Sequence, residues 1–191
     1  MKFFLNILVL SIFIFASCAD KVPVPHPSGY MRIFLPEKKY TQLKGNYPYT
    51  FEYPVYGSIK KDSSKDAQPY WINIEFSEYK AKIHISYKKV NKNLAQYIED
   101  SHKLVYKHSI KADAIQEKRI TRDSANVYGI FFDIKGNVAS SVQFYLTDST
   151  GNFLRGALYF TAQPNKDSIA PVLNFFRTDI EHLINTFKWV R

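Results

Sequence analysis

Two neighbouring segments of this chain alternate strictly between apolar and polar residues, and this alternation constrains the fold more than any other feature. The apolar positions of residues 71–76 and 81–88 are Ile72, Ile74, Phe76, Ile83, Ile85 and Tyr87. A period of two is that of a strand with one face in the core. Because only four residues connect the two segments, they are expected to pair as an antiparallel hairpin whose second face is in contact with water.

Five further segments have the composition of short strands, with aromatic and β-branched residues between turn residues. They are residues 30–35, 48–56, 127–134, 140–147 and 153–161. The last three are separated by Gly136-Asn137 and by the polar run 148–152, which are expected to form turns. Residues 57–69 are polar and are expected to form a loop.

Two segments show the spacing of amphipathic helices. In residues 92–109, Asn93 and Gln96 have the spacing of a capping box. Residues 169–187 carry an apolar stripe over five turns. The sequence therefore predicts the α+β class, with an antiparallel β-sheet of about six strands flanked by two amphipathic helices. This order of elements is similar to the Mog1/PsbP-like fold.

The N-terminus has the features of an export signal. Lys2 precedes an apolar run that is too short to span a bilayer, and the run closes on small residues before Cys18. This boundary resembles a bacterial lipobox, although a secretory signal that happens to end in Cys is the alternative. We expect residues 1–17 to be a lipoprotein signal peptide, 18–28 a lipidated Cys with a Pro-rich linker, and 29–191 a single α+β domain. Lipidation at Cys18 would anchor the chain to a membrane of the cell envelope, outside the cytoplasm and facing the periplasm.

The composition and the motifs of the sequence give no indication of catalysis. Cys18 is the single cysteine, so neither an intramolecular disulfide nor a multi-Cys metal site is expected. The histidines His84, His102, His108 and His182 lack metal-ligand spacing, and neither a nucleophile elbow nor a phosphate-binding loop is present. We therefore expect no enzyme, no metal and no cofactor. The formal net charge is +9, but the basic residues are scattered and the chain is expected to be exported, so nucleic acid is not an expected partner.

Several strings resemble one known family. They are Tyr30-Met-Arg-Ile-Phe-Leu-Pro-Glu-Lys-Lys-Tyr40, Trp71-Ile-Asn-Ile, Tyr97-Ile-Glu-Asp-Ser101, Gln143-Phe-Tyr-Leu-Thr-Asp-Ser-Thr150, Phe153-Leu-Arg-Gly-Ala-Leu-Tyr-Phe160 and Pro164-Asn165. Together with the lipobox they resemble the gliding-motility lipoprotein GldD family of Bacteroidota, in which motility is linked to type IX protein secretion. The resemblance implies a non-enzymatic envelope lipoprotein required for gliding. Its implied partners are envelope proteins of the gliding and secretion machinery, and lipidated Cys18 is the one functional residue it carries over.

Six residues combine a strand or turn location with side chains that are common at interface hot spots. These candidate partner-binding residues are Arg32, Trp71, Tyr145, Asp148, Arg155 and Tyr159. For the three aromatic residues, packing under a helix is an equally good interpretation. Asp148, in Asp-Ser-Thr-Gly-Asn, has the turn chemistry that a hairpin loop needs.

The leading hypothesis is a tethered scaffold or adaptor. Two alternatives remain open at this stage. A ligand-binding module for a lipid or glycan would need an apolar pocket, lined by Phe and Tyr, between the sheet and a helix. A hydrolase would need a polar cleft where histidines or acids converge.

Overall fold

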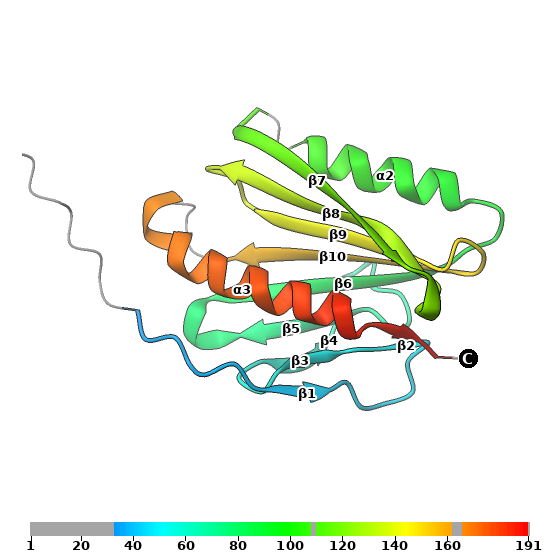
Figure 1. The fold of residues 1–191 in the computed structure, drawn as a ribbon, viewed down its shortest axis with the longest axis horizontal. Helices are drawn as coiled ribbons and strands as arrows, with labels where there is room; N and C mark the ends of the chain where they lie inside the picture. Colours follow the sequence, from blue (N-terminus) through cyan, green and yellow to red (C-terminus); the bar gives the residue numbers. More distant parts are fainter. Residues whose placement is uncertain (1–32, 108–109, 162–165, 191) are drawn as a thin grey trace, which may run out of the picture. The chain divides into compact units, whose positions relative to one another are not determined.

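The computed structural model describes residues 33–107, 110–161 and 166–190, and these are built around an antiparallel sheet of seven strands (Figure 1). The strands follow the order β4-β5-β6-β10-β9-β8-β7. Their bounds are β4 Ser58–Lys61, β5 Ile72–Phe76, β6 Ala81–Lys89, β7 Ala112–Arg122, β8 Val127–Gly136, β9 Val142–Thr147 and β10 Asn152–Phe160. The central pairing joins β6 to β10, which are far apart in the sequence.

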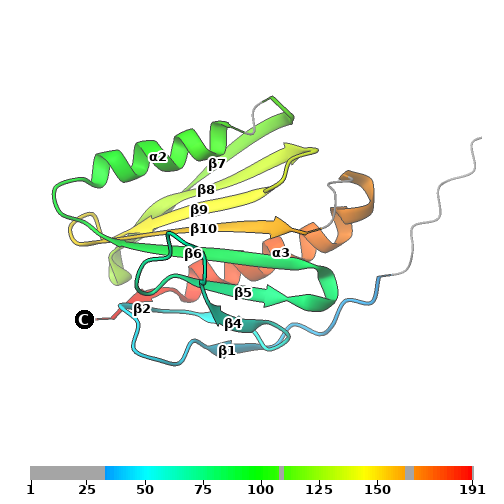
Figure 2. The same cartoon turned by 180° about the vertical axis from the view of Figure 1, so that it is seen from behind.

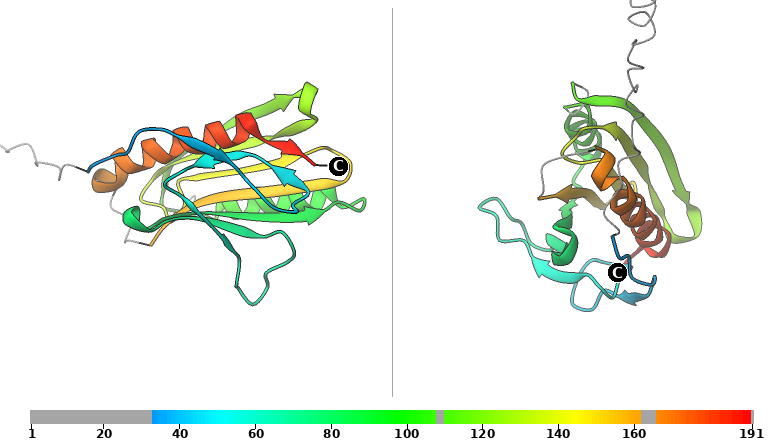
Figure 3. Two further views of the ribbon diagram at one scale, coloured as in Figure 1. Left: turned by 90° about the horizontal axis from the view of Figure 1, so that it is seen from below. Right: turned by 90° about the vertical axis from the view of Figure 1, so that its left-hand side faces the viewer.

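Two long helices cover opposite faces of this sheet (Figure 3). Helix α2, Leu94–Tyr106, packs on a smaller apolar cluster that includes Phe132, Tyr145 and Phe153. Helix α3, Lys166–Thr186, packs on the larger cluster, which contains the inward residues of β5, β6 and β9. Because alternate strand residues point to opposite faces, both faces of the central strands are buried.

The segment before β4 lies against α3 rather than within the main sheet (Figure 2). Strand β1, Tyr40–Gln42, pairs with β3, Glu52–Pro54. Strand β2, Tyr49–Thr50, pairs with β11, Lys188–Trp189, which follows the end of α3. Two short 3-10 turns, η1 Ser77–Tyr79 and η2 Asp123–Ala125, close the β5–β6 and β7–β8 hairpins.

The predicted α+β class is confirmed, and so are the alternating hairpin and the stripe of the last helix. Ile72, Ile74 and Phe76 are each at most 1% exposed, and Phe176 and Ile180 of the stripe are fully buried. The described part of the chain contains no helix that is both long and apolar enough to span a membrane. The predicted single domain over 29–191 stays a prediction.

Several boundaries predicted from the sequence were wrong. Residues 33–35 form no strand, while Arg32 and the rest of that segment lie outside the described residues. The predicted loop 57–69 contains β4, and β7 was also missed. The short strands of segment 48–56, β2 and β3, pair outside the seven-stranded sheet. The hairpin face expected to be wet is partly covered by α2, so Ser86 is only 9% exposed.

The capping box at the start of α2 was also wrong. Asn93 occupies the N-cap position, but its side chain makes no capping hydrogen bond there. Its Oδ1 instead accepts a hydrogen bond from the backbone N–H of Asn91 at 2.8 Å. The side chain therefore stabilises the turn that leads into the helix, in the way that Asn commonly does in turns.

Candidate functional site

Two of the six candidate residues lie in one row across the centre of the sheet. Arg155 of β10 is paired with Ser86 of β6 on one side and with Tyr145 of β9 on the other. Trp71 directly precedes β5, and its indole N–H donates a hydrogen bond to the backbone carbonyl of Tyr87 at 2.7 Å. The sheet thus brings Trp71, Arg155 and Tyr145 to its α2 face.

A small groove opens on this face beside α2, and we refer to it as the α2 groove. Its volume is about 160 Å³. It is lined by Trp71, His84, Ser86, Lys88, Tyr97, Asp100, Ser101, Leu104, Phe153 and Arg155. Aromatic rings and charged groups therefore share the walls, which is typical of a site that fixes a small polar group by a few placed contacts.

The two cationic side chains of the α2 groove are held by uncharged neighbours. The guanidinium of Arg155 donates a hydrogen bond to the side-chain carbonyl of Gln143. The ammonium of Lys88 lies 4.7 Å from the centre of the Tyr97 ring, within the range of a cation–π contact. Gln143 is 1% exposed and its Nε2 has no hydrogen-bond partner.

The remaining described candidates have different surroundings. Tyr145 is buried and stacks on Phe153 with ring centres 5.5 Å apart, and burial raises the pKa of its hydroxyl. Tyr159 lies opposite Lys82 on the same sheet face, outside the α2 groove, and is half-buried. For Tyr145, packing in the core is therefore the better account. Binding through the six candidates stays a prediction.

Asp148 organises the β9–β10 turn. Its Oδ1 accepts hydrogen bonds from the backbone N–H groups of Thr150, Gly151 and Asn152 at 2.8 to 3.0 Å. Burial would raise the pKa of this carboxyl, but these donors and the Asn152 amide outweigh burial and hold the pKa below its usual value. The role visible in the structure is the turn that the sequence indicated.

Replacing Asp148 by Ala is expected to destabilise the fold by about 2 kcal/mol at neutral pH, because three backbone donors lose a charged acceptor. Since the folded pKa is depressed, this stabilisation is present above the unfolded pKa of about 3.9 and is lost as pH falls through the folded pKa. Urea unfolding from pH 7 to pH 3 should therefore show the two curves converging in acid. Asp66→Ala, at an exposed acid, serves as the control; a loss at Asp148 no larger than at Asp66 would contradict this role.

The described histidines are engaged in pairs with acids. His84 Nε2 lies 3.1 Å from Asp62, and His182 Nε2 lies 2.7 Å from Glu52. His102 lies 3.8 Å from Glu117, and His108 lies outside the described residues. No hydroxyl or thiol in the described ranges is hydrogen-bonded to any of these imidazoles. Nor do those ranges hold a group of three His, Cys, Asp or Glu residues suited to a metal ion.

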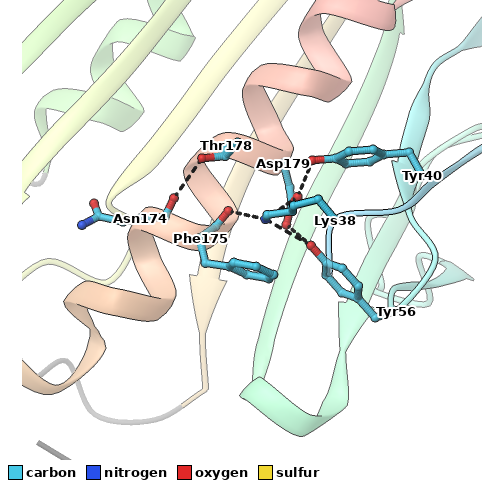
Figure 4. Close-up of polar contacts among 7 residues, drawn as sticks. All are labelled: Lys38, Tyr40, Tyr56, Asn174, Phe175, Thr178 and Asp179. Carbon is cyan, nitrogen blue, oxygen red and sulfur yellow. Dashed lines mark hydrogen bonds and ion pairs between the residues drawn. The ribbon is translucent and has the colours of Figure 1, made fainter. Parts of the chain in front are cut away.

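A second polar cluster, which sequence reasoning missed, fastens the N-terminal segment to α3 (Figure 4). We call it the α3 clasp: Lys38, Tyr40, Tyr56 and Asp179. Asp179 is 1% exposed and accepts hydrogen bonds from Lys38 Nζ at 2.6 Å, from the Tyr40 hydroxyl at 2.9 Å and from the Tyr56 hydroxyl at 2.7 Å. Lys38 Nζ also donates a hydrogen bond to the backbone carbonyl of Phe175. The same ammonium group lies 3.1 Å from the centre of the Phe175 ring.

The electrostatics of the α3 clasp follow from its burial. Burial lowers the pKa of Lys38, although the carboxylate of Asp179 pulls in the opposite direction. Burial and the bond to Asp179 both raise the pKa of Tyr40 and of Tyr56, so these hydroxyls remain donors. Tyr40 also stacks on His182 at 3.6 Å between ring centres. The sequence held one signal: Asp179 sits at helical spacing between Phe176 and Leu183 of the apolar stripe.

These features define an α+β domain with a seven-stranded antiparallel sheet between two helices and a small groove of aromatic and charged residues beside one of them. The chain belongs to the gliding motility lipoprotein GldD family, whose model matches residues 20–189. It is therefore a member of a family of lipid-anchored proteins of the cell envelope. No curated protein matches the chain. Among solved structures, cyanobacterial PsbP (CyanoP) from Synechocystis sp. PCC 6803 is similar at 12% identity and a TM-score of 0.48, covering 86% of this chain and 100% of that chain.

Proposed function

We propose that this chain is a non-enzymatic, lipid-tethered adaptor of the envelope machinery that drives gliding and type IX secretion in Bacteroidota. Membership of the gliding motility lipoprotein family carries the proposal, because the match extends over nearly the whole chain. Residues 1–17 would act as the signal peptide, and Cys18 would carry the lipid on the periplasmic side. The folded domain would dock on another envelope protein.

The α3 clasp supports a role in which the domain is held from its N-terminal side. Lys38 follows Cys18 by only twenty residues in the sequence, and it is fixed to a buried carboxylate on the last helix. Tyr40 and Glu52 contact His182 one turn further along α3. A force applied through the tether would therefore be transmitted to α3, the helix that packs on the larger core cluster.

The polar groups of the described residues also support a non-enzymatic role. The acid–histidine pairs His84–Asp62 and His182–Glu52 join segments that are distant in sequence, so they have a structural role in the fold. The alternative is a ligand-binding module for a lipid or glycan, and its lipid form is less favoured. The α2 groove is smaller than the roughly 300 Å³ at which pockets for drug-sized ligands begin, and a groove between β7 and α3 mixes charged residues with Ile120, Phe131 and Ile184. Two larger grooves, of about 870 and 510 Å³, are lined mainly by polar and charged residues rather than by Phe and Tyr.

Cys18→Ala is expected to move the protein from the membrane fraction to the soluble fraction and to impair gliding, because the acyl chains are the proposed anchor. Fractionation with immunoblotting, together with single-cell tracking, measures both effects. Ser17→Ala, the adjacent small-residue change, is the matched control and should leave both unchanged. Full motility of a released Cys18→Ala protein would count heavily against the tethered adaptor.

An in-frame deletion separates the two processes in the proposal. Gliding and the export of a type IX reporter protein are scored in the same cells. Loss of both places the chain at machinery that the two processes share, and loss of gliding alone places it nearer the motility apparatus. Retention of both would overturn the proposed function.

A further inference from the structure

The α2 groove is lined by two cationic side chains that no acid of the described chain engages. Among the described residues, neither Lys88 nor Arg155 forms an ion pair; Lys88 lies over an aromatic ring and Arg155 binds a neutral amide. A guanidinium offers five N–H donors, and Gln143 accepts from one of them. Several donors of Arg155 therefore remain for another acceptor at the edge of the groove.

The other groups at the groove that can carry a charge near neutral pH are one histidine and two acids. His84 comes from β6 and is paired with Asp62. Asp100, on α2, is the acid that lines the groove. Among the residues that line the groove, Lys88 and Arg155 thus stand beside one carboxylate, Asp100, without an ion pair to it, while Asp62 is bound to His84. An anion that reaches these two cations in the partly buried groove is expected to be favoured.

The buried amide of Gln143, which does not itself line the groove, explains how Arg155 is held there. Its side-chain carbonyl accepts from Arg155, while its Nε2 is buried without an acceptor. A buried donor without a partner costs about 1–3 kcal/mol, so natural folds seldom retain one without a reason. Gln143 acts here as a positioning residue, because it fixes the guanidinium of Arg155 on the groove side of β10.

The size of the groove limits what it can hold. At about 30 Å³ for each water in the liquid, 160 Å³ corresponds to the space of about five waters. An acyl chain is too large for this space. The rings of Trp71, Tyr97 and Phe153 form an apolar wall beside the two cations. A compact, flat body with one charged end matches this arrangement.

We propose that the α2 groove binds a small ligand that carries an oxyanion, a carboxylate or a phosphate, on a compact flat body. The oxyanion accepts hydrogen bonds from Arg155 and Lys88, and the body lies against the three aromatic rings. The hydroxyl groups of Ser86 and Ser101 line the same space, but each already donates its proton to a backbone carbonyl, so the donors to the ligand are those of Arg155 and Lys88. This site is independent of the tether and of the proposed adaptor role.

The chain's two tryptophans make the test direct. Trp71 lines the groove and its indole N–H donates to the carbonyl of Tyr87, next to Lys88, whereas the indole N–H of Trp189 donates to the carbonyl of Asn126 outside the groove. The full chain, ¹⁵N-labelled in a neutral detergent, is titrated with benzoate, phenyl phosphate and benzamide. We expect saturable shifts of the Trp71 indole signal with an anionic probe, no shift of Trp189, and at least tenfold weaker binding of neutral benzamide. Benzoate and phenyl phosphate distinguish the two oxyanions.

Variants assign the binding to the two cations. Lys88→Gln and Arg155→Gln are each expected to weaken the anionic probe at least tenfold. Lys82→Gln is the matched control, because Lys82 lies on the same face of β6 but does not line the groove. The Trp189 signal reports whether each variant is folded. No saturable Trp71 shift with either anion up to about 10 mM, equal binding of benzamide, or unchanged affinity in Lys88→Gln would each overturn the proposal.

Discussion

Asp179→Ala is expected to lower the free energy of unfolding by about 4 kcal/mol. The change removes the acceptor of Lys38, Tyr40 and Tyr56 at once, and breaking a buried ion pair from one side costs about 3–5 kcal/mol. Ala has a higher helix propensity than Asp, so α3 itself should not be weakened. Urea unfolding followed by circular dichroism measures the difference. The free energy of unfolding of Asp179→Asn, which keeps one acceptor but no charge, should lie between that of the unchanged protein and that of Asp179→Ala.

Two further variants test whether the loss arises in the α3 clasp. Glu181→Ala, two residues further along α3 at a half-exposed acid, is the matched control and should stay within about 0.5 kcal/mol. Lys38→Met combined with Asp179→Ala should cost less than the sum of the two single changes, because neither partner is then left buried alone. A loss of less than about 1 kcal/mol in Asp179→Ala would show that solvation of the freed groups compensates for the contacts.

The sequence predicted best those elements that bury a single face. The alternation of β5 and β6 and the stripe of α3 each place their apolar residues on one side, so their period is visible without neighbours. Strand β7 was missed because it lacks such a side. Ile115 packs with the α2 cluster and Ile120 with the α3 cluster. Their positions differ by five, an odd number, so they point to opposite faces.

The candidate site could be predicted only in part. Trp71 and Arg155 stood out as residue types, but their proximity depends on the register of β10 against β6, which joins Arg155 to a partner 69 residues away. The hydrogen bonds of Asp148 join residues two to four positions away, so its role in the turn could be predicted from the sequence. The α3 clasp could also be predicted only in part. Asp179 stands out in the sequence as an acid within the apolar stripe, but its partner Lys38 lies 141 residues away.

Gly156→Ala is expected to cause the second large loss, about 3 kcal/mol, because overpacking a close-packed core costs about 1–3 kcal/mol and occasionally more. Gly156 of β10 is paired with Phe144 of β9, and the Phe144 ring lies directly over its backbone. A Cβ at this position would collide with the Cζ and Cε1 atoms of that ring. Phe144 is 1% exposed and belongs to the larger core cluster, so the ring has no solvent into which to turn.

Thermal unfolding measures this effect, since about 3 kcal/mol corresponds to a fall in Tm of about 10 °C for a chain of this length. Gly151→Ala is the matched control in the turn before β10. The nearest atom to a Cβ there is Asp148 Oδ2 at 3.9 Å, an ordinary contact, so the Tm should change little. Phe144→Leu combined with Gly156→Ala should recover part of the loss, because the smaller side chain frees the space over residue 156. Equal Tm values for the two glycine variants would mean that the Phe144 ring moves aside at no cost, contrary to the dense packing around it.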